Sequence, residues 1–328
     1  INPERELALE TIGLLQVTAA REVAVFAGGA VQLMGITVAD DAPIAGRKLQ
    51  EIGAEERHRS ILTVGIERDG RTIVPGGATE VRAGDHLYVV TGAPDVRRAI
   101  ELCGYERSTV RRVMVAGGSL EAFYVGELLA QHGVQMTMLV DDRERAQELA
   151  GRLDHALVLH GDATDVELLE MEGVGGADAF VALTDEDDTN ILSSLVAKHA
   201  GAKQIITLVN KPAYVPLARR IGLDAAVSPR LSAANAILRY VRAGSVKRVA
   251  TFSGHEGEAI AFAVGAQSPA VGRPLAEVNF PEGSIVAAVV RGRDVVVPRG
   301  DDVLQVGDTA IVFALPDAIR EVTEIFPS

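Results

Sequence analysis

Residues 113–133, VMVAGGSLEAFYVGELLAQHG, contain an apolar strand, a glycine turn and a helical segment in succession. This order of elements forms dinucleotide-binding loops, in which three glycine positions let the backbone and a helix N-terminus approach a pyrophosphate. The chain has Gly117 at the first position, followed by Gly118, but it has Ser119 and Ala122 at the other two. Ala122 is an accepted substitute, whereas Ser119 puts a Cβ where the pyrophosphate would lie. The loop is therefore either a structural strand-to-helix turn or a weak or altered phosphate site.

Acidic residues follow the next predicted strand, where a Rossmann-like domain holds a ribose. Asp141 and Asp142 stand at this place, and either could accept hydrogen bonds from ribose hydroxyls. Asp142 could equally cap a helix that begins at Arg143. Glu121, in the first turn of the preceding helix, favours the helix dipole but repels a phosphate.

The motif HGDATD, residues 160–165, ends the third predicted strand. It would place Asp162 and Ala163 in a turn at the carboxyl edge of the sheet, where Asp162 could accept a hydrogen bond from an adenine amino group. The alternative is that Asp162 or Thr164 caps the helix that follows.

The motif TDEDDTN, residues 184–190, ends the fourth predicted strand at the same edge. Thr184, Asp185 and Asn190 would then face the crevice in which ligands of such sheets bind. Four acids within a few residues could also form a solvated helix start. Each motif alone is weak, but their order and their shared place at strand ends make the set specific.

Residues 109–228 alternate between short apolar strands and helical segments with a period of 3.6. Strands are predicted at 113–116, 136–140, 156–160, 179–184, 204–209 and 225–227. Helices are predicted at 121–132, 143–152, 165–172, 188–199 and 212–221. This alternation is typical of the α/β class, and predicts a Rossmann-like doubly wound parallel sheet with its ligand site at the carboxyl ends of the strands.

An internal repeat flanks this domain, and repeats of this kind decide how the whole fold is interpreted. Equivalent residues follow in the same order: Phe26 and Phe252, Val38 and Val264, Pro43 and Pro269, Gly46 and Gly272, Arg47 and Arg273, Val74 and Val297, Pro75 and Pro298, Gly84 and Gly307, Asp85 and Asp308, and Pro94 and Pro316. Residues 22–104 and 248–328 are thus two copies of one small α+β module.

The repeat extends upstream of each module. Residues 1–18 correspond to the predicted connecting helix at 229–244, since Pro3, Ile12 and Leu15 match Pro229, Leu238 and Val241. We therefore expect residues 1–18 to be the terminal helix of a first nucleotide-binding domain, most of which this chain lacks.

The longest uncharged run, residues 23–39, reaches the lower limit of a membrane span. Its alternation and its glycines favour two strands joined by a turn. The second copy carries His255, Glu256 and Glu258 in the equivalent segment, which a homologous membrane span would not tolerate. We expect β-structure here and no direct insertion into a membrane.

Composition excludes several classes of function. The formal charge of −13 opposes nucleic acid and anionic bilayers, and with 4% aromatic residues and no tryptophan the chain offers little for stacking on bases. One cysteine, Cys103, allows neither an internal disulfide framework nor a CxxC metal site. A reducing cytosolic compartment fits best, and no nucleic acid or metal is expected as a ligand.

The motifs taken together resemble a known family. The glycine loop, GDATDVELLE, ALTDEDDTNILSSLVAKHAGA, LVNKPAY and SPR resemble the nucleotide-binding RCK (KTN) domain, and the repeated module, with VRAGDHLYVV and LQVGDTAIVF, resembles the RCK C-terminal domain. Two such pairs in tandem are similar to the regulatory subunits of Trk-type bacterial potassium uptake systems. The resemblance covers essentially the whole chain.

The resemblance implies a site for NAD(H) or an adenine nucleotide. The matching positions are Gly117, Gly118, Ser119 and Ala122 in the phosphate loop, Asp141 at the ribose, Asp162 and Ala163 by the adenine, and Thr184, Asp185 and Asn190 in the crevice. When the segment ERAQELA, residues 144–150, is used to align this chain with the family, the family's ribose-binding acid falls on Val140. Asp141 then stands one residue after the expected position. With Ser119 and Glu121, this departure predicts that the site here is partly or wholly degenerate, with the main site in the missing domain.

The resemblance also implies a cytoplasmic gating subunit, peripheral to the inner membrane, that couples nucleotide binding to potassium transport. Its partners would be a membrane K⁺-translocating subunit and further copies of itself, as a dimer or tetramer. Two alternatives remain: an NAD-dependent oxidoreductase, and a sensor for another small ligand or an assembly module. An oxidoreductase needs a proton donor or acceptor beside the nicotinamide, and no catalytic motif appears in the sequence, so we expect no catalytic residues.

Overall fold

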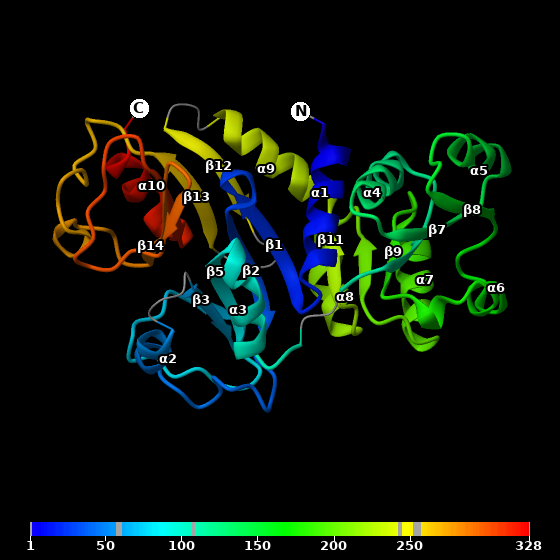
Figure 1. Ribbon diagram of the computed structural model, residues 1–328, viewed down its shortest axis with the longest axis horizontal. Coiled ribbons are helices and arrows are strands. Elements are labelled where there is room, and N and C mark those ends of the chain that lie inside the picture. Colours follow the sequence, from blue (N-terminus) through cyan, green and yellow to red (C-terminus); the bar gives the residue numbers. More distant parts are fainter. Residues whose placement is uncertain (1, 57–60, 107–108, 242–244, 252–256, 328) are drawn as a thin grey trace. The chain divides into compact units, whose positions relative to one another are not determined.

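The computed structural model describes residues 2–56, 61–106, 109–241, 245–251 and 257–327. The chain divides into two compact units, and each is built from segments far apart in the sequence (Figure 1). The first unit comprises Ile1–Arg21 and Ser108–Ala236, and the second comprises Glu22–Arg107 and Ile237–Ser328.

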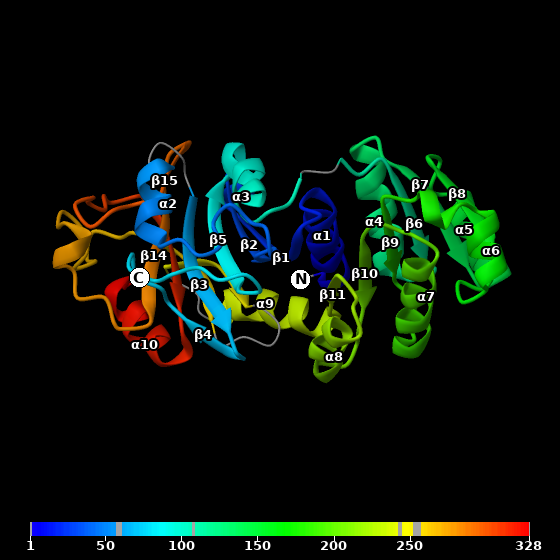
Figure 2. The ribbon, with the colours of Figure 1, turned by 90° about the horizontal axis from the view of Figure 1, so that it is seen from below.

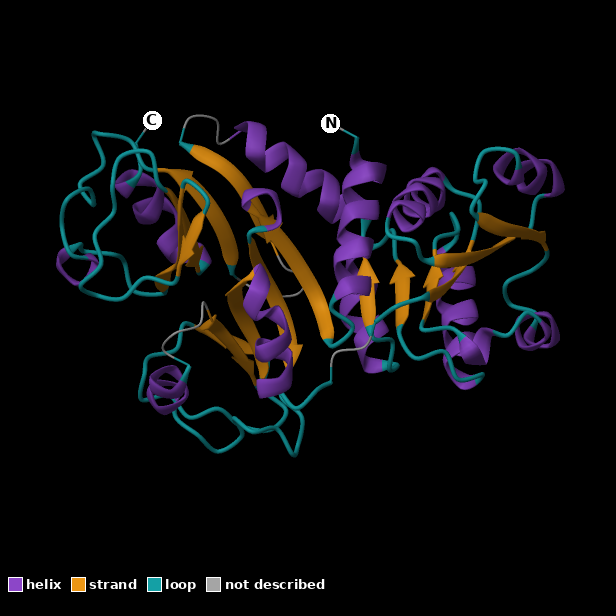
Figure 3. Ribbon diagram, in the orientation of Figure 1, coloured by secondary structure: helices purple, strands orange, loops and turns teal. Residues whose placement is uncertain are grey.

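The first unit contains a six-stranded parallel sheet, which confirms the predicted α/β class (Figure 3). Its strands are β6 (Arg112–Ala116), β7 (Gln135–Val140), β8 (Ala156–His160), β9 (Ala179–Ala182), β10 (Ile205–Leu208) and β11 (Ala225–Val227). Their order is β11-β10-β9-β6-β7-β8, so the winding direction reverses between β6 and β9. A doubly wound sheet binds its ligands at such a switch point.

Helices connect these strands at the predicted places. They are α4 (Leu120–Gln131), α5 (Arg143–Ala150), α6 (Val166–Met171), α7 (Asp187–His199) and α8 (Val215–Arg220), with 3₁₀ turns at Val174–Gly176 and Pro212–Tyr214. The central strands β9 and β10 are buried along their whole length, because helices cover both faces of the sheet.

The N-terminal helix α1 (Pro3–Gln16) belongs to this unit and packs on α4 and β11 (Figures 1 and 2). It starts sharply because Asn2 accepts a hydrogen bond from Arg5 N at 3.0 Å and Pro3 stands at the first helical position. Its buried face includes Leu7 and Leu14, and Gln204 Nε2 donates to Leu14 O at 3.1 Å. The repeat-related helix, α9 (Pro229–Val241), is present as predicted.

The second unit contains two five-stranded antiparallel sheets with the same topology. The first sheet comprises β1 (Ala20–Phe26), β2 (Val31–Thr37), β3 (Ile61–Arg68), β4 (Arg71–Ile73) and β5 (His86–Gly92), and the second comprises β12 (Val246–Thr251), β13 (Glu258–Ala263), β14 (Ser284–Arg291), β15 (Asp294–Val296) and β16 (Thr309–Ala314). The orders β1-β2-β5-β3-β4 and β12-β13-β16-β14-β15 correspond strand by strand, as the repeat predicts. Their helices are α2 (Leu49–Glu55) and α3 (Val96–Leu102) in the first copy and α10 (Pro316–Ile325) in the second, with 3₁₀ turns at Ala27–Gly29, Ala93–Asp95 and Leu275–Glu277.

The two sheets of the second unit share one hydrophobic cluster. Leu33 and Tyr88 of the first copy lie in it with Ala261 and Phe313 of the second, and the Tyr88 and Phe313 rings stack with their centroids 5.9 Å apart. Gly65 leaves room for these rings, because a Cβ there would lie 3.1 Å from both Tyr88 Cδ2 and Phe313 Cζ. The pair of modules therefore has a common core within this unit.

Each module also contains the same ion pair between an arginine and a buried aspartate. Arg68 donates from Nε and Nη2 to the two carboxylate oxygens of Asp85 at 2.7 and 2.6 Å, and Arg291 does the same to Asp308 at 2.9 and 2.8 Å. The backbone amide three residues before each aspartate, that of Arg82 in the first copy, donates to it at 2.8 Å. The repeated Gly-Asp pair is thus a structural turn whose carboxylate is fully bonded.

The uncharged run 23–39 forms the end of β1, the 3₁₀ turn Ala27–Gly29 and β2, which confirms the predicted strands. His255 and Glu256, which supported that prediction from the second copy, lie outside the described residues. None of the described helices has the length and apolar character needed to cross a membrane.

Candidate functional site

A half-open pocket of about 420 Å³ lies at the carboxyl edge of the parallel sheet, at the switch point. Its lining residues come from the ends of β6, β7, β8 and β9 and from the start of α7: Gly117, Leu139, Asp141, His160, Gly161, Asp162, Ala163, Thr164, Thr184 and Thr189. Of the site residues predicted from the sequence, the structure brings Gly117, Asp141, Asp162, Ala163 and Thr184 together in this pocket.

Gly117 can only be glycine. Its φ is +112°, and a Cβ there would lie 2.4 Å from Leu183 O, at the end of β9. Gly117 N donates to Leu139 O at 2.8 Å, which ties the loop to the neighbouring strand. The first glycine of the motif therefore serves the tight turn that the pattern predicts.

Ser119 is the N-cap of α4. Its Oγ accepts a hydrogen bond from Ala122 N at 3.2 Å, and Ala122 lies fully buried in the first turn of α4. Neither residue lines the pocket. The serine hydroxyl is therefore directed to the first turn of its own helix, where Glu121 also stands.

Gly118 lies between strand β7 and helix α5. A Cβ there would be 2.9 Å from both Val140 Cγ1 and Arg145 Cγ. Arg145 Nε donates to Gly118 O at 2.7 Å, and its Nη1 donates to Glu148 Oε2 at 2.6 Å. The sequence did not single out Arg145, because its contact depends on where α5 packs.

The two acids after β7 have different roles. Asp142 Oδ1 accepts from Arg145 N at 2.7 Å and caps α5, so the capping alternative for Asp142 is confirmed. Asp141 is exposed and lines the pocket, and its carboxylate takes part in no hydrogen bond or ion pair with the described residues. Val140, 1% exposed, packs beneath the loop, so the acid that reaches the pocket is Asp141.

Asp162 is held in a tight side-chain turn. Its Oδ1 accepts from Thr164 N at 2.8 Å and from Thr164 Oγ1 at 2.7 Å, and these hydrogen bonds lower the pKa of its carboxyl below the usual value. The alternative that Asp162 or Thr164 caps the next helix is wrong. Asp165 is the cap, because it accepts from Glu167 N at 3.0 Å and from Leu168 N at 3.2 Å. Asp162 is therefore an ionised carboxylate whose Oδ2 accepts none of the described hydrogen bonds.

Asn190 is fully buried and its amide is used internally. Its Oδ1 accepts from Thr184 N and Oγ1, both at 2.8 Å, and its Nδ2 donates to Thr184 O and Leu208 O at 2.9 and 3.1 Å. It holds the ends of β9 and β10 together, while Thr184 faces the pocket. Asp185 is exposed beside the pocket, and its backbone oxygen accepts from Asn210 Nδ2 at 3.2 Å.

Five further lining residues were not predicted as site residues: Leu139, His160, Gly161, Thr164 and Thr189. His160, the last residue of β8, lies with its Nε2 3.1 Å from Asp141 O, and Thr189 lies in the first turn of α7. His160 lies within the motif HGDATD and Thr189 within TDEDDTN. Their positions in these motifs are the sequence feature from which they could have been predicted. The lining carries two carboxylates and, among its described residues, no lysine or arginine.

Within the described part of the chain, no group of three or more histidine, cysteine, aspartate or glutamate side chains could hold a metal ion. Cys103 is 1% exposed, directly after α3, and burial raises the pKa of its thiol to about 12. A thiol so far from ionisation is a packing residue and a poor nucleophile.

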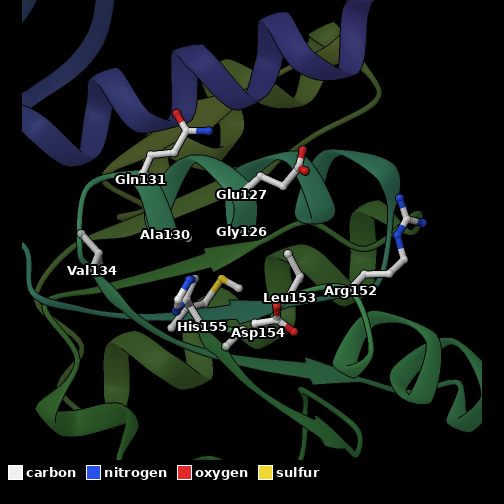
Figure 4. A pocket seen from close by; sticks show the side chains of 11 residues that line it. Gly126, Glu127, Ala130, Gln131, Val134, Arg152, Leu153, Asp154 and His155 are labelled. Carbon is white, nitrogen blue, oxygen red and sulfur yellow. The ribbon is translucent and has the colours of Figure 1, made fainter.

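A second pocket, of about 200 Å³, lies at the opposite edge of the sheet (Figure 4). Glu127 and Gln131 of α4 and Asp154 and His155 before β8 surround it. Arg152 at its rim lies over the Phe123 ring, 4.1 Å from the centroid. This is the amino edge of the strands, away from the switch point.

The fold and the pocket define a Rossmann-like domain that is combined with a duplicated antiparallel module. The TrkA-N domain model matches residues 113–229, and the TrkA-C domain model matches residues 33–104 and 259–326. The chain belongs to the TrkA family.

Two curated relatives match nearly the whole chain. The Trk system potassium uptake protein TrkA homolog 2 of Methanosarcina mazei is 35% identical over 328 residues, which are 99% of this chain and 72% of the relative. The Trk system potassium uptake protein TrkA of Halomonas elongata is 36% identical over 337 residues, again covering 99% of this chain and 72% of the relative.

Solved structures show the same fold. The GsuK RCK domain matches with a TM-score of 0.53 and 18% identity, covering 99% of this chain and 70% of that one. The GsuK channel bound to NAD matches with a TM-score of 0.53 and 17% identity, covering 99% of this chain and 58% of the channel.

Proposed function

We propose that this chain is a regulatory subunit of a Trk-type potassium uptake system, in which nucleotide binding at the carboxyl-edge pocket controls a membrane K⁺-translocating subunit. One observation carries the proposal: in a chain of the TrkA family, a glycine loop, two carboxylates and a threonine converge at the switch point of a parallel sheet. Ligands of doubly wound sheets bind at this point.

The ligand that fits these groups is NAD(H) or another adenine nucleotide, such as ATP or ADP. The turn at Gly117 allows a phosphate to approach the backbone, Asp141 is placed for ribose hydroxyls, and Asp162 offers Oδ2 to an adenine amino group. A structural neighbour of the same fold is a channel bound to NAD, which agrees with this choice. The alternative is that this copy of the site is degenerate and the main site lies in a preceding domain.

The domains that we assign are a terminal helix at 1–18, RCK C-terminal modules at 22–104 and 248–328, a nucleotide domain at 109–228 and a connecting helix at 229–244. In this arrangement the nucleotide changes how the domains of a homo-oligomer are arranged, and this biases the open state of the membrane subunit. The coupling cannot exceed the difference in the affinity of the nucleotide for the two states.

The assembly that this requires is a dimer or tetramer, cytoplasmic and peripheral to the inner membrane through its partner. Leu192 and Leu195 on α7 are 52% and 36% exposed, which supports a surface for self-association there. The net charge of −13 favours docking on a basic protein surface over direct contact with anionic lipid.

A regulator is favoured over an oxidoreductase by the groups around the pocket. His160 is its one described histidine, and its Nε2 lies within hydrogen-bond distance of a backbone oxygen. Cys103, the only cysteine of the chain, is buried. Hydride transfer would need a proton donor or acceptor poised beside the nicotinamide.

The test is potassium flux into proteoliposomes that contain the cognate membrane subunit. Adding the full chain with ADP, ATP or NADH should change the flux relative to the chain without nucleotide. Flux that is the same with and without nucleotide would contradict the proposal. Oxidation of NADH with an added aldehyde or keto acid would favour the oxidoreductase instead.

A further inference from the structure

Arg145 is a cation in direct contact with the glycine loop. Its Nε donates to Gly118 O at 2.7 Å, and Glu148 accepts from its Nη1 and so holds the guanidinium in place. The arginine side chain is 28% exposed, so part of it is accessible to solvent. Arg145 therefore gives the glycine loop a hydrogen-bonded cation, whose charge Glu148 partly offsets. The nearby pocket lining carries carboxylates and no described lysine or arginine.

The bond to Gly118 O also orients a peptide plane. In a trans peptide the carbonyl oxygen and the next amide hydrogen point in opposite directions, and the structure has no described cis bond. Since Arg145 holds the carbonyl on the α5 side, the amide of Ser119 points away from α5. Within the described part of the chain, this amide donates no backbone hydrogen bond.

Arg145 links the loop to the ribose end of the pocket as well. Asp142 Oδ1 accepts from Arg145 N at 2.7 Å, so the residue next to Asp141 fixes the backbone from which the arginine extends. The crowding of Gly118 against Val140 and Arg145 leaves this contact little freedom. The start of α5 therefore joins the acid after β7 to the glycine loop after β6.

We propose that Arg145 is a positioning residue for the phosphates of the bound nucleotide. It sets the Gly118–Ser119 peptide so that the Ser119 amide, just outside the pocket lining, is open to a phosphate that extends past Gly117. Its guanidinium adds positive charge beside the loop. This role rests on the proposed nucleotide site. It also supplies positive charge against the negative charges of Glu121 and Asp141, which repel a phosphate. Arg145 acts on the phosphates and leaves the recognition of the base and ribose unchanged.

The test compares a ligand with phosphates and one without. ADP and adenosine are titrated calorimetrically into the full chain and into R145M, R145K and R152M. Arg152 is the matched control, since it also pairs with Glu148, at 2.9 Å, but none of its described hydrogen bonds reaches the loop. R145M should lose about tenfold in ADP affinity, the equivalent of one charge-assisted hydrogen bond, with adenosine affinity unchanged.

R145K should recover part of the ADP affinity, because it restores the charge without the fork of the guanidinium. R152M should match the unchanged protein with both ligands. Equal losses for ADP and adenosine in R145M, or none for either, would overturn the role of Arg145 while leaving the nucleotide site intact. If the unchanged chain binds neither ligand, the nucleotide site itself is wrong and the inference falls with it. Should R145M fail to fold, the ADP-to-adenosine ratio of R145K decides.

Discussion

Aspartates at strand ends have opposite environments in the two units of this molecule. In the repeated modules, Asp85 and Asp308 are 3% and 2% exposed, and each receives two hydrogen bonds from an arginine and one from a backbone amide. At the carboxyl edge of the parallel sheet, Asp141 and Asp162 keep carboxylate oxygens that no described group engages. Saturated carboxylates stabilise a fold, whereas open ones around a pocket are available to a ligand.

The largest effect should come from breaking the saturated pairs. Asp85→Ala leaves the partly buried Arg68 guanidinium without its carboxylate partner, and we expect a loss of about 3 kcal/mol in the free energy of unfolding. Asp308→Ala should cost less, because Arg291 is more exposed than Arg68. Urea unfolding followed by circular dichroism measures both. Asp141→Ala, the open counterpart, should leave stability unchanged.

Gly117→Ala should come next. The substitution forces a Cβ to within 2.4 Å of Leu183 O at a φ of +112°, so we expect a loss of roughly 2 to 3 kcal/mol in stability and no nucleotide binding. Gly133→Ala is the matched control, because Gly133 also has a positive φ, +67°, but nothing within 4 Å of the added atom. Its cost should stay near 1 kcal/mol, with binding retained. Equal effects at both glycines would contradict the role of the close approach.

A smaller effect should appear in the dependence of the free energy of unfolding on pH. It arises from Asp178, an acid of the first unit whose carboxylate is fully hydrogen-bonded. Burial raises the pKa of Asp178, but Lys203 and the amides of Arg111 and Arg112 outweigh it and lower the pKa to about 2. A depressed pKa stabilises the fold above the unfolded value of about 3.9, and this contribution, roughly 2 kcal/mol, is lost as pH falls from about 4 to 2. Asp178→Asn should flatten the dependence of unfolding free energy on pH over this window. A variant that retains the full slope would show that other carboxyls cause it.

The smallest expected effect on stability comes from the motif HGDATD, in which Asp165 caps a helix and Asp162 is proposed to bind the nucleotide. Asp165→Ala removes the N-cap of α6 and should cost about 1 kcal/mol in stability, with nucleotide affinity unchanged. Asp162→Ala should show the reverse pattern, a stability change within about 0.5 kcal/mol and a loss of affinity. Thermal unfolding and ligand titration of both variants check this. Loss of affinity in the Asp165 variant would mean that the turn as a whole, and not Asp162, makes the site.

The repeat and the strand-end motifs made much of this architecture predictable. Strands and helices from 113 to 227 follow apolar runs that a parallel sheet buries, and the two modules share a topology because they share a sequence pattern. Hydrogen-bond partners could not be predicted in the same way. Asn190 and Asp162 both lie in polar motifs that follow a strand. The Asn190 amide forms hydrogen bonds with Thr184 and Leu208, whereas Asp162 lines the pocket. Such choices depend on tertiary packing, as does the contact of Arg145 with Gly118.

The most direct measurement is calorimetric titration of ADP, ATP and NADH into the full chain and into Asp162→Ala. The account predicts saturable binding of at least one nucleotide at one site per chain, weakened about tenfold or more in the variant because a hydrogen bond from the adenine to a carboxylate is lost. Absence of binding in the unchanged chain, or equal affinity in the variant, would contradict the claim that this pocket is the nucleotide site. The first of these results would favour the degenerate alternative.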